Sequence, residues 1–136
     1  IDFKKSPPVR PLVILGALSN EIYDEILRRC PGKFKGVVPV TSRSCRGCKQ
    51  HIYDDYHYIS REQFISEIRQ NKYIECGQFQ NNFYGTRFKK VKEIVQKGHN
   101  CIVDIHHHNS IRRLKSIANI HPIVIAVKPS TPAQIM

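Results

Sequence analysis

PLVILG, at residues 11–16, is a continuous apolar run that ends in a glycine. Such a run is typical of a β-strand that is buried on both faces of a parallel sheet. After it, apolar side chains recur at helical spacing from Ile22 to Leu27, and the stretch CPG at 30–32 ends the helix. These residues predict a β-turn-α unit at the start of the folded domain.

Strands and amphipathic helices alternate along the rest of the chain. Further strands are predicted at 36–40, 53–59 and 73–79, and buried strands at 101–105 and 122–127. Helices are predicted at 60–71, with Phe64, Ile65 and Ile68 facing the core, at 86–97, with Arg87, Lys89, Lys90, Lys92 and Lys97 on its outer face, and around Ile111, Leu114 and Ile117. This order predicts an α/β fold with three layers and a mainly parallel central sheet.

The chain of 136 residues has the composition of one globular domain, with 40% hydrophobic and 24% charged residues. We expect a proline-bearing linker at 1–9 and a single domain at 10–136. We expect neither a membrane span nor a signal peptide, because no apolar stretch is long enough. Five cysteines, an odd number, favour reduced thiols inside the cell. The net charge of +11 favours an anionic partner without identifying it.

The turn after the first strand is where an α/β fold of this kind would bind a nucleotide phosphate. A phosphate-binding loop there needs a second glycine, a lysine, and a serine or threonine. The turn begins with Gly16, but the positions of the second glycine, the lysine and the hydroxyl residue are occupied by Glu21, Ile22 and Tyr23. We therefore predict a degenerate nucleotide loop that does not hold a triphosphate.

A second motif suggests metal chemistry. Cys45, Cys48 and His51 have a spacing that can supply three ligands to a tetrahedral zinc ion. No fourth ligand is obvious, so we predict no metal site and keep zinc as an open alternative. The three histidines at 106–108 are interpreted as a polar turn between a strand and a helix.

Six short blocks occur in order along nearly the whole chain: RPLVILG at 10–16, VPVTSRSCR at 38–46, DYHYIS at 55–60, IECGQF at 74–79, YGT at 84–86 and CIVDI at 101–105. In this combination the sequence resembles a guanylate-kinase-like domain. It is most similar to the Discs-large-type membrane-associated guanylate kinase homologues. The resemblance implies a P-loop-kinase-like fold with a small mononucleotide-binding-type subdomain. It also implies further helices beyond residue 136, so we expect a C-terminally truncated domain.

The resemblance assigns six residues to a site for a nucleoside monophosphate. Arg43, Arg46, Tyr56 and Tyr84 would surround the phosphate, and Glu75 and Thr86 would lie nearer the guanine. The residue types are consistent with a phosphate at this position, because arginine guanidinium groups match phosphate oxygens and tyrosine hydroxyls add neutral donors. Two positions depart from the enzymes: Pro39 replaces a serine, and His106 replaces a second acidic residue after Asp104.

These observations predict a non-catalytic interaction domain of a scaffold protein. The resemblance implies that it binds phosphorylated Ser or Thr segments of partner proteins, needs no cofactor, and contacts neighbouring modules such as a Src-homology-3 domain. An acidic membrane surface is a further candidate partner for the basic helix at 86–97. No specific nucleic acid is expected, because aromatic residues are not interleaved with the basic ones. The expected location is cytoplasmic, peripheral to the plasma membrane at cell junctions or synapses.

Two other functions stay open. The chain could be a guanylate kinase, which phosphorylates GMP with ATP, although the degenerate loop argues against an ATP site. It could also be a structural domain that only binds neighbouring scaffold modules.

Overall fold

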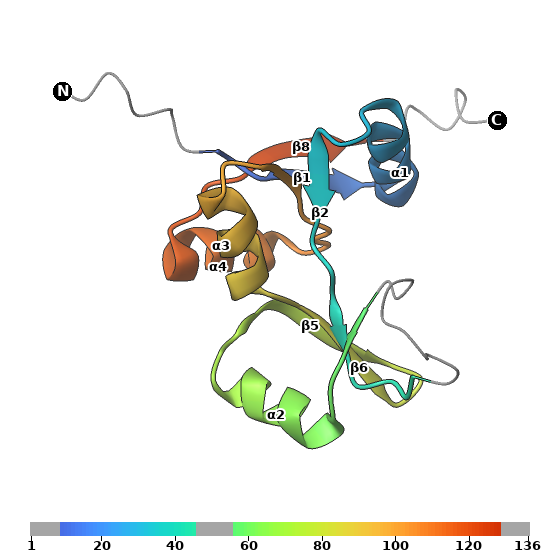
Figure 1. Ribbon diagram of the computed structural model, residues 1–136, viewed down its shortest axis with the longest axis vertical. Coiled ribbons are helices and arrows are strands. Elements are labelled where there is room, and N and C mark those ends of the chain that lie inside the picture. The colour runs from blue at the N-terminus through green and yellow to red at the C-terminus, as the bar shows by residue number, and fades with distance from the viewer. Residues whose placement is uncertain (1–8, 46–55, 129–136) are drawn as a thin grey trace.

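The computed structural model of the chain describes residues 9–45 and 56–128 (Figure 1). The elements in chain order are β1 (Leu12–Gly16), α1 (Ser19–Arg29), β2 (Phe34–Gly36), β3 (Val40–Thr41), β4 (His57–Tyr58), α2 (Arg61–Arg69), β5 (Tyr73–Phe79), β6 (Asn82–Arg87), α3 (Phe88–Gln96), β7 (Asn100–Ile102), α4 (His108–Ala118) and β8 (Ile123–Val127). They form one sheet with the order β2-β7-β1-β8 and a second with the order β4-β3-β6-β5. The predicted linker at 1–9 lies, apart from Val9, outside the described residues.

The first sheet is the centre of a three-layer arrangement. All of its strand pairs are parallel. Because side chains alternate between the two faces of a strand, Ile14 packs with Tyr23 of α1 on one face, whereas Val13 packs with Val91 of α3 and Leu114 of α4 on the other. The predicted three-layer α/β fold with a parallel central sheet is therefore confirmed.

The second sheet forms a smaller lobe, which lies at the end of the molecule away from α1 (Figure 1). Its core is built around Phe64 of α2, whose ring stacks on the rings of Tyr73 at 4.5 Å and Phe83 at 5.2 Å. Val40 completes this cluster. Ser60 caps α2, because its hydroxyl accepts a hydrogen bond from the backbone N–H of Gln63 at 3.1 Å.

Three predicted strands are shorter in the structure. The strand predicted at 101–105 is β7, which ends at Ile102. The stretch predicted as one strand at 36–40 contributes Gly36 to β2 of the first sheet and Val40 to β3 of the second. Between them lies Pro39, which has no N–H to donate to a strand ladder, and its carbonyl accepts from His57 N at 2.8 Å. Of the strand predicted at 53–59, the structure has β4 at His57–Tyr58, and residues 53–55 lie outside the described part.

The predicted helix at 86–97 begins two residues too early, because Thr86 and Arg87 belong to β6. Strand β6 was not predicted at all. It pairs antiparallel with β5 through a two-residue turn in which Gln80 has φ 48° and Asn81 has φ 65°. This turn type usually contains glycine next to asparagine or aspartate. Because Gln80 is neither, the sequence did not indicate a hairpin here.

The last strand was predicted to be buried, and this prediction is wrong. In β8, Ile123 is 46% exposed, Val124 39% and Ile125 48%. The reason is topological, because β8 is an edge strand whose neighbour in the described residues is β1 alone. Ile68, predicted to face the core, is also exposed. In the described part of the chain, none of the helices has the length and hydropathy needed to cross a membrane.

Candidate functional site

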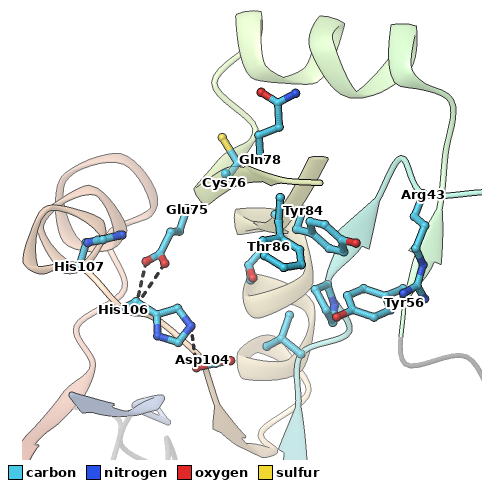
Figure 2. Close-up of a pocket in the computed structure, with 15 residues that line it drawn as sticks. Arg43, Tyr56, Glu75, Cys76, Gln78, Tyr84, Thr86, Asp104, His106 and His107 are labelled. Atoms are coloured by element: carbon cyan, nitrogen blue, oxygen red, sulfur yellow. Dashed lines mark hydrogen bonds and ion pairs between the residues drawn. The ribbon is translucent and has the colours of Figure 1, made fainter. Parts of the chain in front are cut away.

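A cavity of about 640 Å³ lies between the two sheets (Figure 2). Its lining comes from β5 and β6, from the segments on either side of β3, from Tyr56 just before β4, and from the residues that follow β7. Five of the six residues predicted for the phosphate and guanine site line it: Arg43, Tyr56, Glu75, Tyr84 and Thr86. The sixth, Arg46, lies outside the described residues. The structure thus brings the described members of the predicted site together, while their roles stay predictions.

Strand register positions these side chains. Glu75 of β5 lies directly opposite Thr86 of β6, and Tyr84 of β6 lies opposite Thr41 of β3. Gly85 between them is buried where no larger residue fits, because an added Cβ would lie 2.8 Å from Cδ1 of Tyr73. The glycine therefore lets β6 approach the core while its two neighbours line the cavity.

Arg43 lies at one end of the cavity, surrounded by aromatic rings (Figure 2). Its Nη2 donates a hydrogen bond to the hydroxyl of Tyr58 at 3.1 Å, and its guanidinium carbon lies 5.2 Å from the ring centre of Tyr56. Tyr56 in turn meets the edge of Tyr84 at 5.6 Å. The hydrogen bond to Tyr58 raises the pKa of Arg43, and the guanidinium is exposed without an acidic partner among the described residues. We call these four residues the Arg43 cluster.

Tyr58 was not predicted from the sequence. A signal was present, because Tyr56 and Tyr58 are two positions apart, and such residues share one face of an extended segment. Both contact Arg43, whose guanidinium carbon lies 5.9 Å from the ring centre of Tyr58. The backbone N–H of Arg43 donates to Oγ1 of Thr41 at 3.1 Å, which fixes the start of the segment that carries the guanidinium.

The opposite end of the cavity is acidic (Figure 2). The Glu75 carboxylate accepts a hydrogen bond from the backbone N–H of His106 at 3.0 Å, and His106 Nε2 lies 3.3 Å from Oδ1 of Asp104. Desolvation raises the pKa of Asp104, and the Glu75 charge raises it further, while His106 opposes the shift. His106 and His107 both line the cavity and were interpreted from the sequence only as part of a polar turn. The cavity is therefore cationic at the Arg43 end and carries two carboxylates at the other.

The turn between β1 and α1 packs closely against the end of β8. Gly16 has φ 106°, and a Cβ there would lie 2.1 Å from the carbonyl oxygen of Val127, so only glycine allows β8 to approach. Helix α1 already begins at Ser19, so the exposed Glu21 and the half-buried Ile22 belong to a helix and not to a loop around a ligand.

Tyr23 of α1 is buried beneath this turn. Its hydroxyl accepts from Ile14 N at 2.9 Å and donates to the carbonyl oxygen of Val103 at 2.6 Å. Burial raises the pKa of Tyr23 to about 12. The hydroxyl at the position of the magnesium-binding Ser or Thr is therefore engaged with the backbone of β1 and of the segment that follows β7.

Arg87 was predicted on the solvated outer face of a helix, and this prediction is wrong. Its side chain is 13% exposed, and its Nη2 donates to Oε1 of Glu67 at 2.7 Å and to Oε2 at 2.9 Å. The hydroxyl of Tyr73 donates to the same carboxylate at 2.6 Å. Arg87 is the last residue of β6, directly before α3, and its side chain is directed toward Glu67 of α2. This network holds α2 against β5 and β6.

The zinc alternative stays a prediction. Cys48 and His51 lie outside the described residues. Within the described ranges, no group of three or more His, Cys, Asp and Glu side chains is arranged to hold a metal ion.

Comparison with known proteins identifies the family of this chain. Residues 8–136 match the guanylate kinase family, so the chain belongs to that family. It is 38% identical over 128 residues to Disks large homolog 1 of Danio rerio and to Disks large homolog 3 of Homo sapiens, which confirms the resemblance to Discs-large-type domains. These matches cover 93% of this chain but only 14% and 15% of the relatives, so the chain spans a small part of their length.

A solved structure confirms the fold. The crystal structure of guanylate kinase from Anaplasma phagocytophilum aligns with a TM-score of 0.59 over 96% of this chain and 65% of that chain. The sequence identity is 21%, so this likeness concerns the fold alone.

Proposed function

We propose that this domain is a non-catalytic recognition module of a scaffold protein, which binds phosphorylated Ser or Thr segments of partner proteins in the cavity between its two sheets. The observation that carries the proposal is the Arg43 cluster. Its guanidinium is held in place by Tyr58 and Tyr56, is open to the cavity, and has no acidic partner among the described residues.

The chemistry of this end of the cavity suits a phosphate. An arginine offers paired planar donors that match phosphate oxygens, and charge-assisted hydrogen bonds of this kind are stronger than neutral ones. Tyrosine hydroxyls add donors without further charge. A volume of about 640 Å³ lies within the usual range for ligand sites, so it accommodates a phosphorylated side chain together with part of the adjoining peptide.

Phosphoryl transfer needs a second site that holds the donor nucleotide and its magnesium ion. In this chain Tyr23 and Ile22 pack against the first sheet at the corresponding turn. Ile22 supplies no ammonium group and the Tyr23 hydroxyl is already hydrogen-bonded, which supports recognition of a phosphate without transfer.

The second candidate function is a guanylate kinase. One observation favours it, because Glu75 and Asp104 place hydrogen-bond acceptors at the end of the cavity opposite Arg43, as a base with N–H donors would require. A purely structural role beside neighbouring scaffold modules is a third candidate. We also propose that the domain belongs to a membrane-associated scaffold on the cytoplasmic side of cell junctions or synapses, and the similarity to the Disks large homologs supports this proposal.

The test is a peptide array that compares phosphorylated with unphosphorylated Ser and Thr sequences, followed by calorimetric titration of the strongest pair. We expect Arg43→Ala to weaken binding of the phosphopeptide about tenfold to hundredfold, because it removes charge-assisted bonds to the phosphate. The control carries Lys89→Ala and Lys92→Ala, two exposed helix lysines that do not line the cavity. It should retain the preference for the phosphorylated form, since these charges act through screened solvent.

Equal losses in the two variants would place the phosphate elsewhere. Duplex DNA of arbitrary sequence serves as a further competitor, because counterion release makes its binding fall steeply with salt. If DNA bound as tightly as the best phosphopeptide at physiological salt, generic basicity would explain the binding and the proposal would be withdrawn.

A further inference from the structure

A second, smaller cavity of about 160 Å³ lies between α3 and β2, away from the Arg43 cluster. We call it the basic groove. It is lined by Lys35, Val38, Lys90, Glu93, Ile94, Lys97 and His99. Nothing in the proposed phosphate site uses these side chains.

The groove is built from two elements that are distant in sequence. Lys90, Ile94 and Lys97 are spaced three and four residues apart, so they share one side of α3. Lys35 belongs to β2, which is an edge strand because it pairs with β7 on one side only in the described residues. Parallel pairing with β7 carries Lys35 to the same side of the molecule as α3.

The segment between β2 and β3 separates the groove from the larger cavity. Val37 and Pro39 line the larger cavity, whereas Gly36 and Val38 line the groove. This alternation is that of an extended chain, in which successive residues face opposite sides. The two sites are therefore neighbours on opposite sides of one strand-like segment, and a ligand can occupy either alone.

The charge in the groove is unbalanced. Its acidic residue, Glu93, lies 3.8 Å from Nζ of Lys90 and compensates that ammonium group. Lys35 and Lys97 are exposed and have no acidic partner within the described ranges. His99 stands beside them, held by a hydrogen bond from its backbone N–H to the carbonyl oxygen of Ile94 at 3.2 Å. The rim therefore has at least two cationic groups available to an anionic ligand.

The groove also offers apolar surface. Val38 is 47% exposed, and Ile94 is partly buried beside it. Lysine ammonium groups around an apolar centre suit a ligand in which carboxylates flank an apolar side chain. We propose that the basic groove binds an acidic segment of a partner protein, with one apolar side chain against Val38 and carboxylates at Lys35 and Lys97.

Two other anionic partners fit less well. A membrane surface contacts broad faces, whereas this site is a hollow with room for about one side chain. Nucleic acid without sequence preference is held by stacking on aromatic rings along an extended basic track, and the described lining residues include no phenylalanine, tyrosine or tryptophan.

The probe is a labelled peptide of sequence EELEE, titrated against the full 136-residue chain by fluorescence anisotropy. The groove variant carries Lys35→Gln and Lys97→Gln. The matched control carries Lys89→Gln and Lys92→Gln, which removes the same charge from exposed positions outside the groove. We expect about fivefold or greater weakening in the groove variant and less than about twofold in the control, because exposed charge pairs act over short range. A peptide EESEE should bind more weakly than EELEE, since serine does not cover Val38.

The probe contains no phosphate, so its binding is independent of the phosphopeptide proposal. No binding of EELEE would overturn the inference, as would equal weakening in the two variants or equal binding of EESEE. Vesicles containing phosphatidylserine and duplex DNA are tested in parallel. If the vesicles or the DNA bound more tightly than EELEE, and if this binding were lost in the groove variant, the surface would be assigned to a membrane or to nucleic acid. That result would also overturn the inference.

Discussion

The hydroxyl of Tyr23 donates a hydrogen bond to the carbonyl oxygen of Val103 at 2.6 Å, which ties α1 to the segment that follows β7. The same hydroxyl oxygen accepts from the N–H of Ile14 in β1 at 2.9 Å. One phenol group therefore links a helix to β1 and to the backbone that directly follows the neighbouring strand β7. Tyr23, which stands where a phosphate-binding loop has a serine or threonine, therefore has a structural role.

Replacing Tyr23 with phenylalanine should destabilise the domain. The change leaves a buried N–H and a buried carbonyl without a side-chain partner, which costs about 1–3 kcal/mol. Urea denaturation of Tyr23→Phe measures this loss. Tyr58→Phe is the control, because the hydrogen bond that its hydroxyl accepts from Arg43 is exposed to solvent, and it should change the free energy of unfolding by less than about 0.5 kcal/mol. Equal stability of the two variants would contradict the role of Tyr23.

The buried carboxylate of Glu67 should make stability depend on pH. Burial alone would raise the pKa of Glu67, but the hydrogen bonds from Tyr73 and Arg87 outweigh it and hold the pKa below the ordinary value of 4.5. A carboxyl with a lowered folded-state pKa stabilises the fold fully above its unfolded pKa, and this stabilisation is lost as the pH falls through the folded value.

We therefore expect Glu67→Gln to lower the free energy of unfolding by about 1.5–3 kcal/mol at neutral pH. The difference from the unmodified chain should shrink as the pH falls below 4.5. Glu62→Gln, at an exposed position of the same helix, should have an effect below about 1 kcal/mol. Chemical denaturation at a series of pH values measures these differences, and a difference that stays constant down to low pH would argue against the charged pair.

Gly85 should not tolerate a side chain. A Cβ there would lie 2.8 Å from Tyr73 Cδ1 and 3.1 Å from Phe64 Cζ, so Gly85→Ala overpacks the core of the small lobe and should cost about 1–3 kcal/mol. Gly77→Ala is the matched control on the neighbouring strand, where nothing lies within 4 Å of the added atom. Thermal melts of both variants distinguish a steric effect from the general effect of replacing glycine, which would lower both melting temperatures alike.

We expect no conversion of GMP and ATP to the two diphosphates. The first turns of α1 have Glu21, Ile22 and Tyr23 where transfer requires a glycine, a lysine and a hydroxyl. A coupled assay for ADP, with an active guanylate kinase as positive control, measures turnover. Activity that scales with the purified protein and disappears in Arg43→Ala would identify the chain as an enzyme.

Much of the candidate site could be predicted from short blocks of sequence. Arg43, Tyr56 and Glu75 each belong to a local pattern, and the structure brings them to one cavity. Tyr58 and His106 were not predicted as site residues, because their contribution depends on a partner from another element. Tyr58 meets the Arg43 guanidinium, and the backbone N–H of His106 meets the Glu75 carboxylate.

The sequence by itself determined the order of helices and strands in the parallel layer, because buried positions repeat with the period of the local backbone. Val13, Val91 and Leu114 follow such patterns, and all three are buried. Only the tertiary structure decided that β8 lies at an edge with Ile125 exposed, and that Arg87 is directed toward Glu67. Local periodicity reports whether a face is apolar, whereas exposure and ion pairing depend on which distant segments pack beside it.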